Sequence, residues 1–458
     1  MTTAAPPVIE PRTYLRLVAL GAAMGIPAAL VAAVFLSAIH VVEGWLWEDL
    51  PHALGASSPP PYLVIGIPAV GGALVALARR LLPGDGGHSP LDGIGAGVTP
   101  LNHAPGIVLA ALGTLAFGAV LGPEAPLIAI GSCVGLAFGM SRRFGPNEKA
   151  VLATAGSFAA ISALFGGPMV GALLMVEGGL ERGRALVPIL IPGFVAAAIG
   201  YVIFIGLGGW PGLAEPGLAV PALPPYTSTS VLDLVLGVVV GVVTAVLIAA
   251  VRRGARTLSV EGRARVPMPV LLIGGGLAVG LLAQVAGWLG ADSQSVLFSG
   301  QDAVPGLVSE TSTSIVAILL VTKALAYGIS LGAGFRGGPV FPAIFLGIAV
   351  AMFPVIWFGV SPTLAVAIGA AAGVVVVTRL LVTAVLFAAL LTGTAGFDTV
   401  SAAVLASASA WIAISALDRL ARPAEPTEAV DGPPEAGSEP SELVDGPADV
   451  AAERPATA

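Results

Sequence analysis

The chain is poor in charged residues, which excludes most classes of soluble protein. Only 10% of its 458 residues are charged and 56% are hydrophobic, whereas about 25% of the residues of a soluble domain are charged. Five long runs contain no Asp, Glu, Lys or Arg, namely 150–176, 185–214, 266–291, 337–378 and 399–417. Because about 20 apolar residues cross the hydrocarbon layer of a bilayer, these runs predict membrane helices. We therefore expect a multi-pass protein of the cell membrane.

Cysteine and histidine are also scarce, which argues against an enzyme or a metal protein. Cys133 is the only cysteine, so an internal disulfide and a cysteine-based zinc site are excluded. The four histidines, His40, His52, His88 and His103, have no metal-binding spacing such as H-E-x-x-H, and no serine or cysteine nucleophile stands out. We expect no enzyme activity, no cofactor, no metal and no nucleic-acid partner.

The acidic charge of the chain is confined to its C-terminal end. Residues 421–458 hold nine acidic residues against Arg422 and Arg454, and this segment alone accounts for the net charge of −7. It is rich in Pro, Ala, Gly and Glu and has few large apolar residues, so it cannot offset the entropy lost on ordering. We expect a disordered acidic tail over 421–458 and a membrane body that is close to neutral.

A polar, proline-rich break divides the apolar body into two halves. Before it, Arg12 and Arg16 precede an apolar run that continues to Val42, which is too long for a signal peptide and predicts a retained span with a cytoplasmic N-terminus. The break is WPGLAEPGLAVPALPPYTSTS, from Trp210 to Ser230. The expected parts are a cytoplasmic N-terminal segment 1–14, a first membrane repeat 15–210, a linker 211–230 and a second membrane repeat 231–420.

The two halves share a short motif. Residues 122–131 are GPEAPLIAIG and residues 338–347 are GPVFPAIFLG, identical at five of ten positions. Internal repeats with broken helices are typical of transporters and channels, whose sites lie where the broken helices of the two halves meet. Proline in a first helical turn loses no hydrogen bond, so Pro123 and Pro339 predict helix starts rather than kinks.

Glu124 is the only charged residue from Gly93 to Ser141. A carboxylate at membrane depth costs several kcal/mol unless it is solvated or neutralised, so it indicates a functional site. The alternative is a glutamate at a helix end near the lipid headgroups. The first turn of a helix has unpaired N–H groups and a partial positive charge that attract an anion. Glu124 could fill such a site itself, compete with a free anion and leave when protonated, which would make it a gate.

The residues around Glu124 resemble the CLC family of chloride channels and chloride/proton exchangers. Gly122-Pro123-Glu124-Ala125-Pro126 is similar to the family motif G-[KR]-E-G-P, and GGPVFPAIFLG, from Gly337, is similar to G-x-F-x-P. The resemblance implies an all-α polytopic membrane protein with a CLC-like inverted repeat of many tilted and broken helices. It also implies anion contacts from the backbone of Ala125, Val340 and Phe341, since Pro339 has no N–H to offer.

A third motif bears on the identity of the anion. The family segment G-S-G-I-P aligns with Gly86-Gly87-His88-Ser89-Pro90, so Gly87 lacks the serine hydroxyl that would bind the inner anion. The resemblance implies an anion site at Gly87, His88 and Ser89, in which His88, Ser89 or the backbone amides replace that hydroxyl. The serine form favours chloride or nitrate, and fluoride-exporting relatives also depart from it. Chloride is the expected ion and fluoride the alternative.

Proton coupling stays open at this stage. GGPMVGALLMVE, which ends at Glu177, resembles the family segment that carries two adjacent glutamates, of which the second is the internal proton acceptor. Here that position is Gly178, and an offset of one residue turns a side chain by about 100° around a helix. Glu124 and Glu177 are therefore candidates for a proton pathway, and a surface carboxylate beside Glu181 is the alternative for Glu177. The family tyrosine of the inner site has no counterpart, since Tyr327 is the last tyrosine.

Two cations, Lys323 and Arg336, stand in apolar runs. Either could raise the electrostatic potential that draws anions in. Such side chains more often extend to the membrane interface, which we expect for Lys323 and leave open for Arg336.

These features together predict transport of small inorganic anions by a CLC-type channel or anion/proton exchanger gated by a glutamate. A secondary transporter of another solute is the alternative from a different class, although it would usually contain several buried carboxylates. The expected partners are chloride or another small anion, protons in the exchanger case, the lipid bilayer and, as the resemblance implies, a second copy in a homodimer.

Overall fold

The computed structural model describes residues 11–95, 97–140, 144–179, 187–207, 210 and 218–421. Its α-helices are α1 (Pro11–Gly44), α2 (Leu50–Ala53), α3 (Pro61–Leu81), α4 (Ala104–Leu115), α5 (Glu124–Phe138), α6 (Pro146–Leu164), α7 (Pro168–Gly178), α8 (Val187–Gly206), α9 (Val231–Arg265), α10 (Met268–Trp288), α11 (Val304–Ser309), α12 (Thr313–Ala333), α13 (Val340–Phe358), α14 (Pro362–Thr378), α15 (Leu381–Thr392) and α16 (Val400–Ala421). A π-helical turn, η1 (Trp45–Asp49), and 3-10 segments η2 (Pro90–Asp92), η3 (Leu101–His103) and η5 (Gly393–Thr399) complete the described elements.

The helices begin close to the predicted boundaries of the two membrane repeats. α1 begins at Pro11, four residues before the predicted start of the first repeat, and α9 begins at Val231, where the second repeat was predicted to start. Residues 1–10, residues 211–217 of the predicted linker and the predicted acidic tail beyond Ala421 lie outside the described residues.

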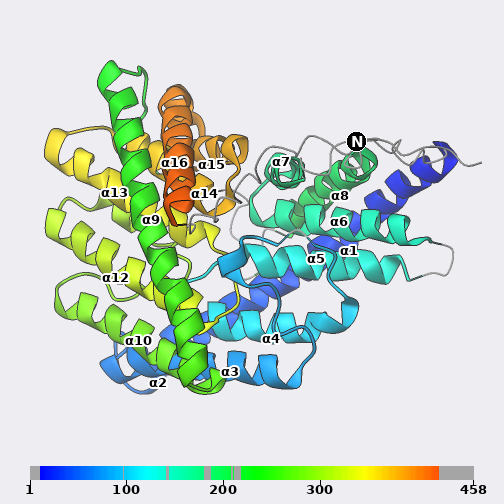
Figure 1. The fold of residues 1–458 in the computed structure, drawn as a ribbon, viewed down its shortest axis with the longest axis horizontal. Coiled ribbons are helices and arrows are strands. Elements are labelled where there is room, and N and C mark those ends of the chain that lie inside the picture. The colour runs from blue at the N-terminus through cyan, green and yellow to red at the C-terminus, as the bar shows by residue number, and fades with distance from the viewer. Residues whose placement is uncertain are drawn as a thin grey trace, which may run out of the picture. The chain divides into compact units, whose positions relative to one another are not determined.

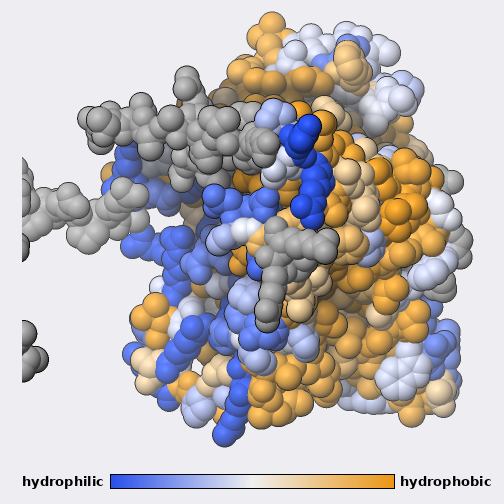
Figure 2. Space-filling model, turned by 90° about the vertical axis from the view of Figure 1, so that its right-hand side faces the viewer, coloured by the Kyte–Doolittle hydropathy of each residue, from blue (hydrophilic) through white to orange (hydrophobic). Residues whose placement is uncertain are grey.

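The lengths and surfaces of the helices are those of a multi-pass membrane protein. In the described part of the chain, eight helical segments are long and apolar enough to cross a bilayer, and four shorter apolar helices accompany them. One example is α9, which exposes a row of large apolar side chains that includes Val235, Val239, Val242 and Val246. Figure 2 shows a broad hydrophobic area on one face of the molecule. Such an area would be a liability in water, whereas lipid tails cover it at no cost.

Proline and small polar residues set the helix starts. Pro123 and Pro339 stand directly before the first residues of α5 and α13, which confirms both as helix starts. At the start of α9, the Ser230 hydroxyl accepts a hydrogen bond from the Asp233 amide, while the Asp233 carboxylate accepts one from the Ser230 amide. This reciprocal pair satisfies donors that a helix start would otherwise leave unpaired.

Equivalent helix pairs in the two repeats pack in the same way. α5 packs on α6 in the first repeat, and α13 packs on α14 in the second. At the crossing of α5 and α6, Gly131 and Gly156 face each other so closely that a Cβ on either would overlap the backbone of the other. Gly347 and Gly369 do the same at the crossing of α13 and α14. Small residues at membrane helix crossings allow this close backbone approach.

The two repeats meet where α5 and α13 begin. Gly122 donates its amide to the carbonyl of Gly338 at 2.8 Å, and Gly338 donates to the carbonyl of Gly122 at 2.6 Å, in an antiparallel bridge. α3 of the first repeat also packs on α10 of the second, and the long helix α9 runs obliquely across α12 and α14 (Figure 1). Equivalent elements of an inverted repeat thus face each other, and this brings two helix N-termini to one place.

Candidate functional site

The carboxylate of Glu124 lies at the start of a helix of the other repeat. Glu124 is the first residue of α5 and is fully buried, at 0% exposure. Its Oε1 accepts hydrogen bonds from the amides of Val340 (2.7 Å) and Phe341 (3.3 Å), in the first turn of α13. These are the two amides that the sequence predicts as an anion site. The carboxylate of Glu124 therefore occupies the position expected for the anion.

Two glycines enclose this carboxylate. A Cβ on Gly122 or on Gly338 would overlap the carboxyl group of Glu124. The second carboxylate oxygen, Oε2, is buried and has no hydrogen-bond partner among the described residues. Because an unsatisfied polar atom in a low-dielectric site is costly, the bound carboxylate is only partly compensated. The carboxylate is thus held at this place through only one of its two oxygens.

Aromatic residues surround the same turn. Tyr327, in α12, is fully buried, and its hydroxyl donates to the carbonyl of Pro339 at 3.1 Å, directly before Val340. The Phe341 ring lies 5.8 Å from that of Phe165, measured between centroids, and Phe165 packs edge-on against Phe387 at 4.7 Å. These side chains exclude water from the site, which strengthens its electrostatic interactions. Sequence patterns alone did not connect Tyr327 with the glutamate site.

The predicted contact at Ala125 belongs to the start of α5. Ala125 is buried, at 6% exposure, and lies in the first turn of the helix. First-turn amides have no acceptor within their own helix, so the Ala125 amide is available to an anion by its position.

The predicted segment Gly87 to Ser89 forms a tight loop before η2. Gly87 adopts a left-handed conformation with φ of 101°, and its amide donates to the carbonyl of Gly84 at 2.9 Å. That amide is already used, which makes Gly87 the weakest of the three predicted contacts. His88 is exposed, and half-buried Ser89 directly precedes the short helix η2. The hydroxyl and the amide of Ser89 have no hydrogen bond among the described residues.

Arg336 ties this loop to the start of α13. Arg336 is 4% exposed, its Nε donates to the carbonyl of Asp85 at 2.9 Å, and its guanidinium forms an ion pair with the Asp85 carboxylate. Arg79 donates to both oxygens of the same carboxylate, at 2.8 and 2.9 Å. Burial raises the pKa of Asp85, but the hydrogen bond from Arg79 and the charges of the two arginines outweigh it and lower that pKa. Arg336 is thus a structural link and does not extend to an interface.

The prediction that Lys323 extends to the membrane interface is wrong. Its side chain is fully buried, and Nζ donates to four successive carbonyls of the turn after α10, those of Ser295, Val296, Leu297 and Phe298, at 2.9, 3.2, 2.9 and 3.5 Å. The ammonium also lies 4.6 Å from the centroid of the Phe345 ring. A buried ammonium is tolerated when all its protons find acceptors, and this turn supplies them.

Glu177 binds the start of α15. Its Oε1 accepts from the Val382 amide at 3.0 Å, and its Oε2 accepts from the amide and the hydroxyl of Thr383, at 2.8 and 2.7 Å. Both oxygens are thus satisfied, and the residue is only half-buried. No hydrogen bond in the described part of the chain joins Glu177 to the Glu124 site. Glu181, the neighbour considered from the sequence, lies outside the described residues.

A cavity of about 540 Å³ opens beside the start of α15. Three arginines, Arg252, Arg256 and Arg379, line it together with residues 91–95, Gly178, Leu380 and Asp418. Arg252 donates to the carbonyl of Leu91 at 2.9 Å and so holds the segment that follows Ser89. The arginines at 252, 253 and 256 in α9 are the feature of the sequence that indicates positive charge at this place. Asp92 and Asp418 also line the cavity, and Asp418 forms an ion pair with Arg379. The three arginines still leave a net positive charge, which attracts anions.

Among the described residues, no group of three or more His, Cys, Asp or Glu side chains is arranged to hold a metal ion.

Comparison with known proteins identifies the family of this chain. The family described as voltage gated chloride channel matches residues 88–413. Proteins of Escherichia fergusonii and Escherichia coli named as ion-transport protein YfeO are 31% identical over 358 residues, which cover 74% of this chain and 79% of theirs.

Solved structures share the fold at low sequence identity. A slow cyanobacterial Cl⁻/H⁺ antiporter superposes with a TM-score of 0.70 at 18% identity, covering 90% of this chain and 98% of that one. A CLC-type fluoride/proton antiporter superposes with a TM-score of 0.68 at 19% identity, covering 88% and 96%. With the family matched over most of its length, the chain belongs to the voltage-gated chloride channel family, the CLC family that its glutamate motif resembles.

Proposed function

We propose that this protein transports small inorganic anions, chloride foremost, and that Glu124 is its gate. The observation that carries the proposal is the pair of hydrogen bonds from the Val340 and Phe341 amides to the Glu124 carboxylate. A carboxylate and a free anion compete for the same donors when those donors form the first turn of a helix. Membership in a family of anion channels and transporters supports the same function.

In the proposed mechanism, protonation of Glu124 opens the site. An ionised carboxylate makes charge-assisted hydrogen bonds to the two amides, and these weaken once the group is neutral. The neutral side chain leaves, and a dehydrated anion takes its place at the start of α13. The helix N-terminus offsets part of the cost of dehydration. Anion flux through the protein is therefore expected to rise as the pH falls.

The route to this site is proposed to begin at the cavity lined by Arg252, Arg256 and Arg379. Positive charge there raises the local anion concentration. Anions would then pass the loop that contains His88 and Ser89, with Gly87 at its edge, and reach the amides of Ala125 and Val340. Sequence similarity to the family further supports a homodimer with one such route in each subunit.

Under this proposal, the protein can work as an exchanger or as a channel, and the transported ion can be chloride or fluoride. As an exchanger, the protein would carry a proton on Glu124 each time the gate cycles, with Glu177 as the candidate for a second acid on that path. As a channel, it would pass anions without moving protons. Fluoride is the second candidate ion, because Gly87 lacks the hydroxyl that chloride-selective relatives use at this motif.

The test is flux from liposomes that contain the purified protein. Chloride, nitrate and fluoride efflux are compared under equal gradients while the external pH is followed. Anion efflux with stoichiometric proton uptake supports the exchanger, and efflux without it supports the channel. A preference for fluoride would replace chloride in the proposal. No anion efflux under any gradient would refute it.

A further inference from the structure

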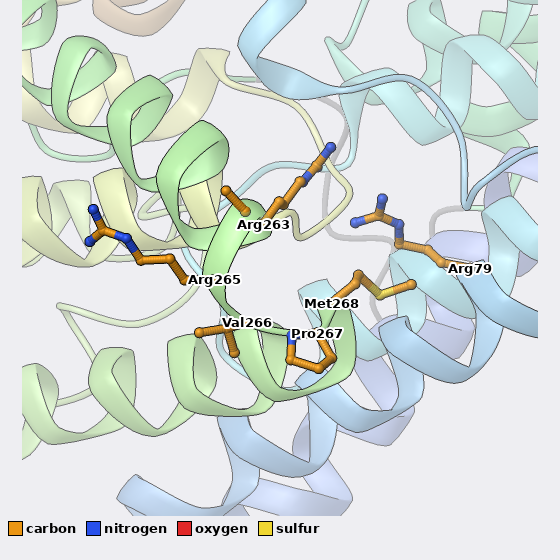
Figure 3. Close-up of a pocket in the computed structure, with 7 residues that line it drawn as sticks. Arg79, Arg263, Arg265, Val266, Pro267 and Met268 are labelled. Carbon is orange, nitrogen blue, oxygen red and sulfur yellow. The ribbon is translucent and has the colours of Figure 1, made fainter.

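A second cavity lies apart from the Glu124 site, where α3 ends and α9 turns into α10. Its volume is about 460 Å³, and it is lined by Arg79 on one side and by residues 263–268 on the other (Figure 3). α9 ends at Arg265 and α10 begins at Met268, so the cavity opens at the end of two membrane helices. Ends of membrane helices lie at the level of the lipid headgroups.

Two guanidinium groups converge in this cavity. Nη1 of Arg79 donates to the carbonyl of Gly334 at 2.9 Å, and the Arg79 side chain is only 5% exposed. Nη2 of Arg263 reaches the same glycine, where it would lie 3.4 Å from a Cβ on Gly334. Figure 3 shows the Arg263 side chain extended toward Arg79, whereas that of Arg265 points to the opposite side.

The positive charge at this place is not balanced by the described residues. Asp85 pairs with both Arg79 and Arg336, so one carboxylate serves two guanidinium groups. Arg263 has no ion-pair partner within the described ranges, whereas Arg265 pairs with Glu261. Nη1 of Arg336 is buried and also lacks a hydrogen-bond acceptor there. Like charges held close together favour binding of an anion, and a doubly charged one most of all.

We propose that Arg79 and Arg263 form a binding site for a phosphate group, separate from the transport route. A guanidinium group can donate two parallel hydrogen bonds to two oxygens of one phosphate group. A phosphate group also carries enough negative charge to balance two guanidinium groups. The source is either inorganic phosphate or the headgroup of an anionic phospholipid with an exposed phosphomonoester. Both present the same chemistry to the two arginines, and the position of the cavity at helix ends allows either.

Occupancy of this site would act on the transport machinery through shared residues. Arg79 holds Asp85, next to the loop of Gly87 to Ser89, and also holds Gly334, at the end of α12. A bound phosphate reduces the repulsion between Arg79 and Arg263. It therefore stabilises the loop that contains Asp85 and the end of α12, which Arg79 holds. The bound protein is therefore expected to unfold at a higher temperature than the free protein.

The experiment measures the thermal unfolding midpoint of the delipidated, detergent-solubilised protein. One arm titrates inorganic phosphate against chloride at equal ionic strength. The other arm adds phosphatidic acid, with phosphatidylcholine as the neutral control. The informative variant is Arg263→Gln, and the matched control is Arg265→Gln, because both arginines are exposed on the same turn but only Arg263 faces Arg79.

We expect phosphate or phosphatidic acid to raise the midpoint of the wild type and of the Arg265→Gln variant. Arg263→Gln should bind about tenfold more weakly, since it loses a charge-assisted pair of hydrogen bonds. Arg263→Lys keeps the charge but loses the paired N–H donors of the guanidinium group, so its affinity should lie between those of the wild type and Arg263→Gln. A response to phosphatidic acid alone assigns the site to lipid, and a response in both arms assigns it to the phosphate group itself. Equal responses of the Arg263→Gln and Arg265→Gln variants, or no response of the wild type in either arm, would overturn the proposal.

Discussion

Two glutamates of the first repeat each bind the start of a helix in the second repeat, and they do so in different ways. Glu124 binds α13 through one oxygen, while the other oxygen is buried without a partner. Glu177 binds α15 through both oxygens, which accept three hydrogen bonds from Val382 and Thr383. Glu124 is fully buried and enclosed by glycines, whereas Glu177 is half-buried.

The difference shows that a carboxylate at the start of a helix can be paired completely or only in part. A carboxylate whose two oxygens both accept hydrogen bonds from the first turn of a helix stabilises that helix. A carboxylate that binds a helix through one oxygen, with the other oxygen buried and unpaired, makes fewer of the hydrogen bonds open to it. Glu177 therefore has the geometry of a structural cap, whereas Glu124 has the incompletely paired carboxylate that the proposed gate requires.

The sharpest test of this comparison is Glu124→Gln, for which we expect the largest effect. Glutamine resembles the protonated side chain, so it cannot hold the amides of Val340 and Phe341 as a charged group does. Anion flux should lose its entire pH response and stay, at neutral pH, near the level that the wild type reaches in acid. Efflux from liposomes over a series of external pH values measures this. A pH response that survives the change would remove Glu124 from the gate.

Gly338→Ala should have an intermediate effect on the same response. The added methyl group takes the space of the Glu124 carboxyl group, so it should displace the carboxylate, weaken the pH dependence of flux and cost about 1–3 kcal/mol of stability. Gly274→Ala is the matched control, because a Cβ on Gly274 meets open space. Flux assays and thermal unfolding of both variants give the comparison. If Gly338→Ala keeps the wild-type flux, pH dependence and unfolding midpoint, the added methyl group does not displace the Glu124 carboxylate.

Glu177→Ala should change stability and leave the gate alone. The variant leaves the first amides of α15 without their acceptor, which typically costs about 1–2 kcal/mol. We expect a lower unfolding midpoint in detergent, with anion flux and its pH response close to those of the wild type. Lost proton movement at unchanged stability would instead make Glu177 the second acid of the exchanger form and end the contrast between the two glutamates.

Much of the Glu124 site was predictable because its parts are short motifs. The Gly-Pro pairs at 122 and 338 identify two helix starts, and proline without an N–H leaves the amides of Val340 and Phe341 as the donors. The composition and the uncharged runs are likewise sufficient to predict a multi-pass helical protein, because the thickness of a bilayer sets the number of apolar residues that a helix needs to cross it.

The partners of the remaining charged residues were not predictable from local patterns. Lys323 finds its four carbonyls 25 to 28 residues away, Glu177 finds its amides 205 and 206 residues away, and Arg336 finds Asp85 at a separation of 251 residues. The expectation for Lys323 was wrong because a lone lysine in an apolar run shows nothing of the backbone acceptors that packing brings to it.

The sequence by itself thus determined the membrane helices, the repeat and the two helix starts that carry Glu124, Val340 and Phe341, since each depends on neighbours along the chain. Only the tertiary structure decided that the carboxylate of one repeat lies on the amides of the other, through the bridge between Gly122 and Gly338. It also decided which charged residues are buried and paired. The physical reason is that buried charges are stabilised by atoms close in space, and separation along the chain does not specify that closeness.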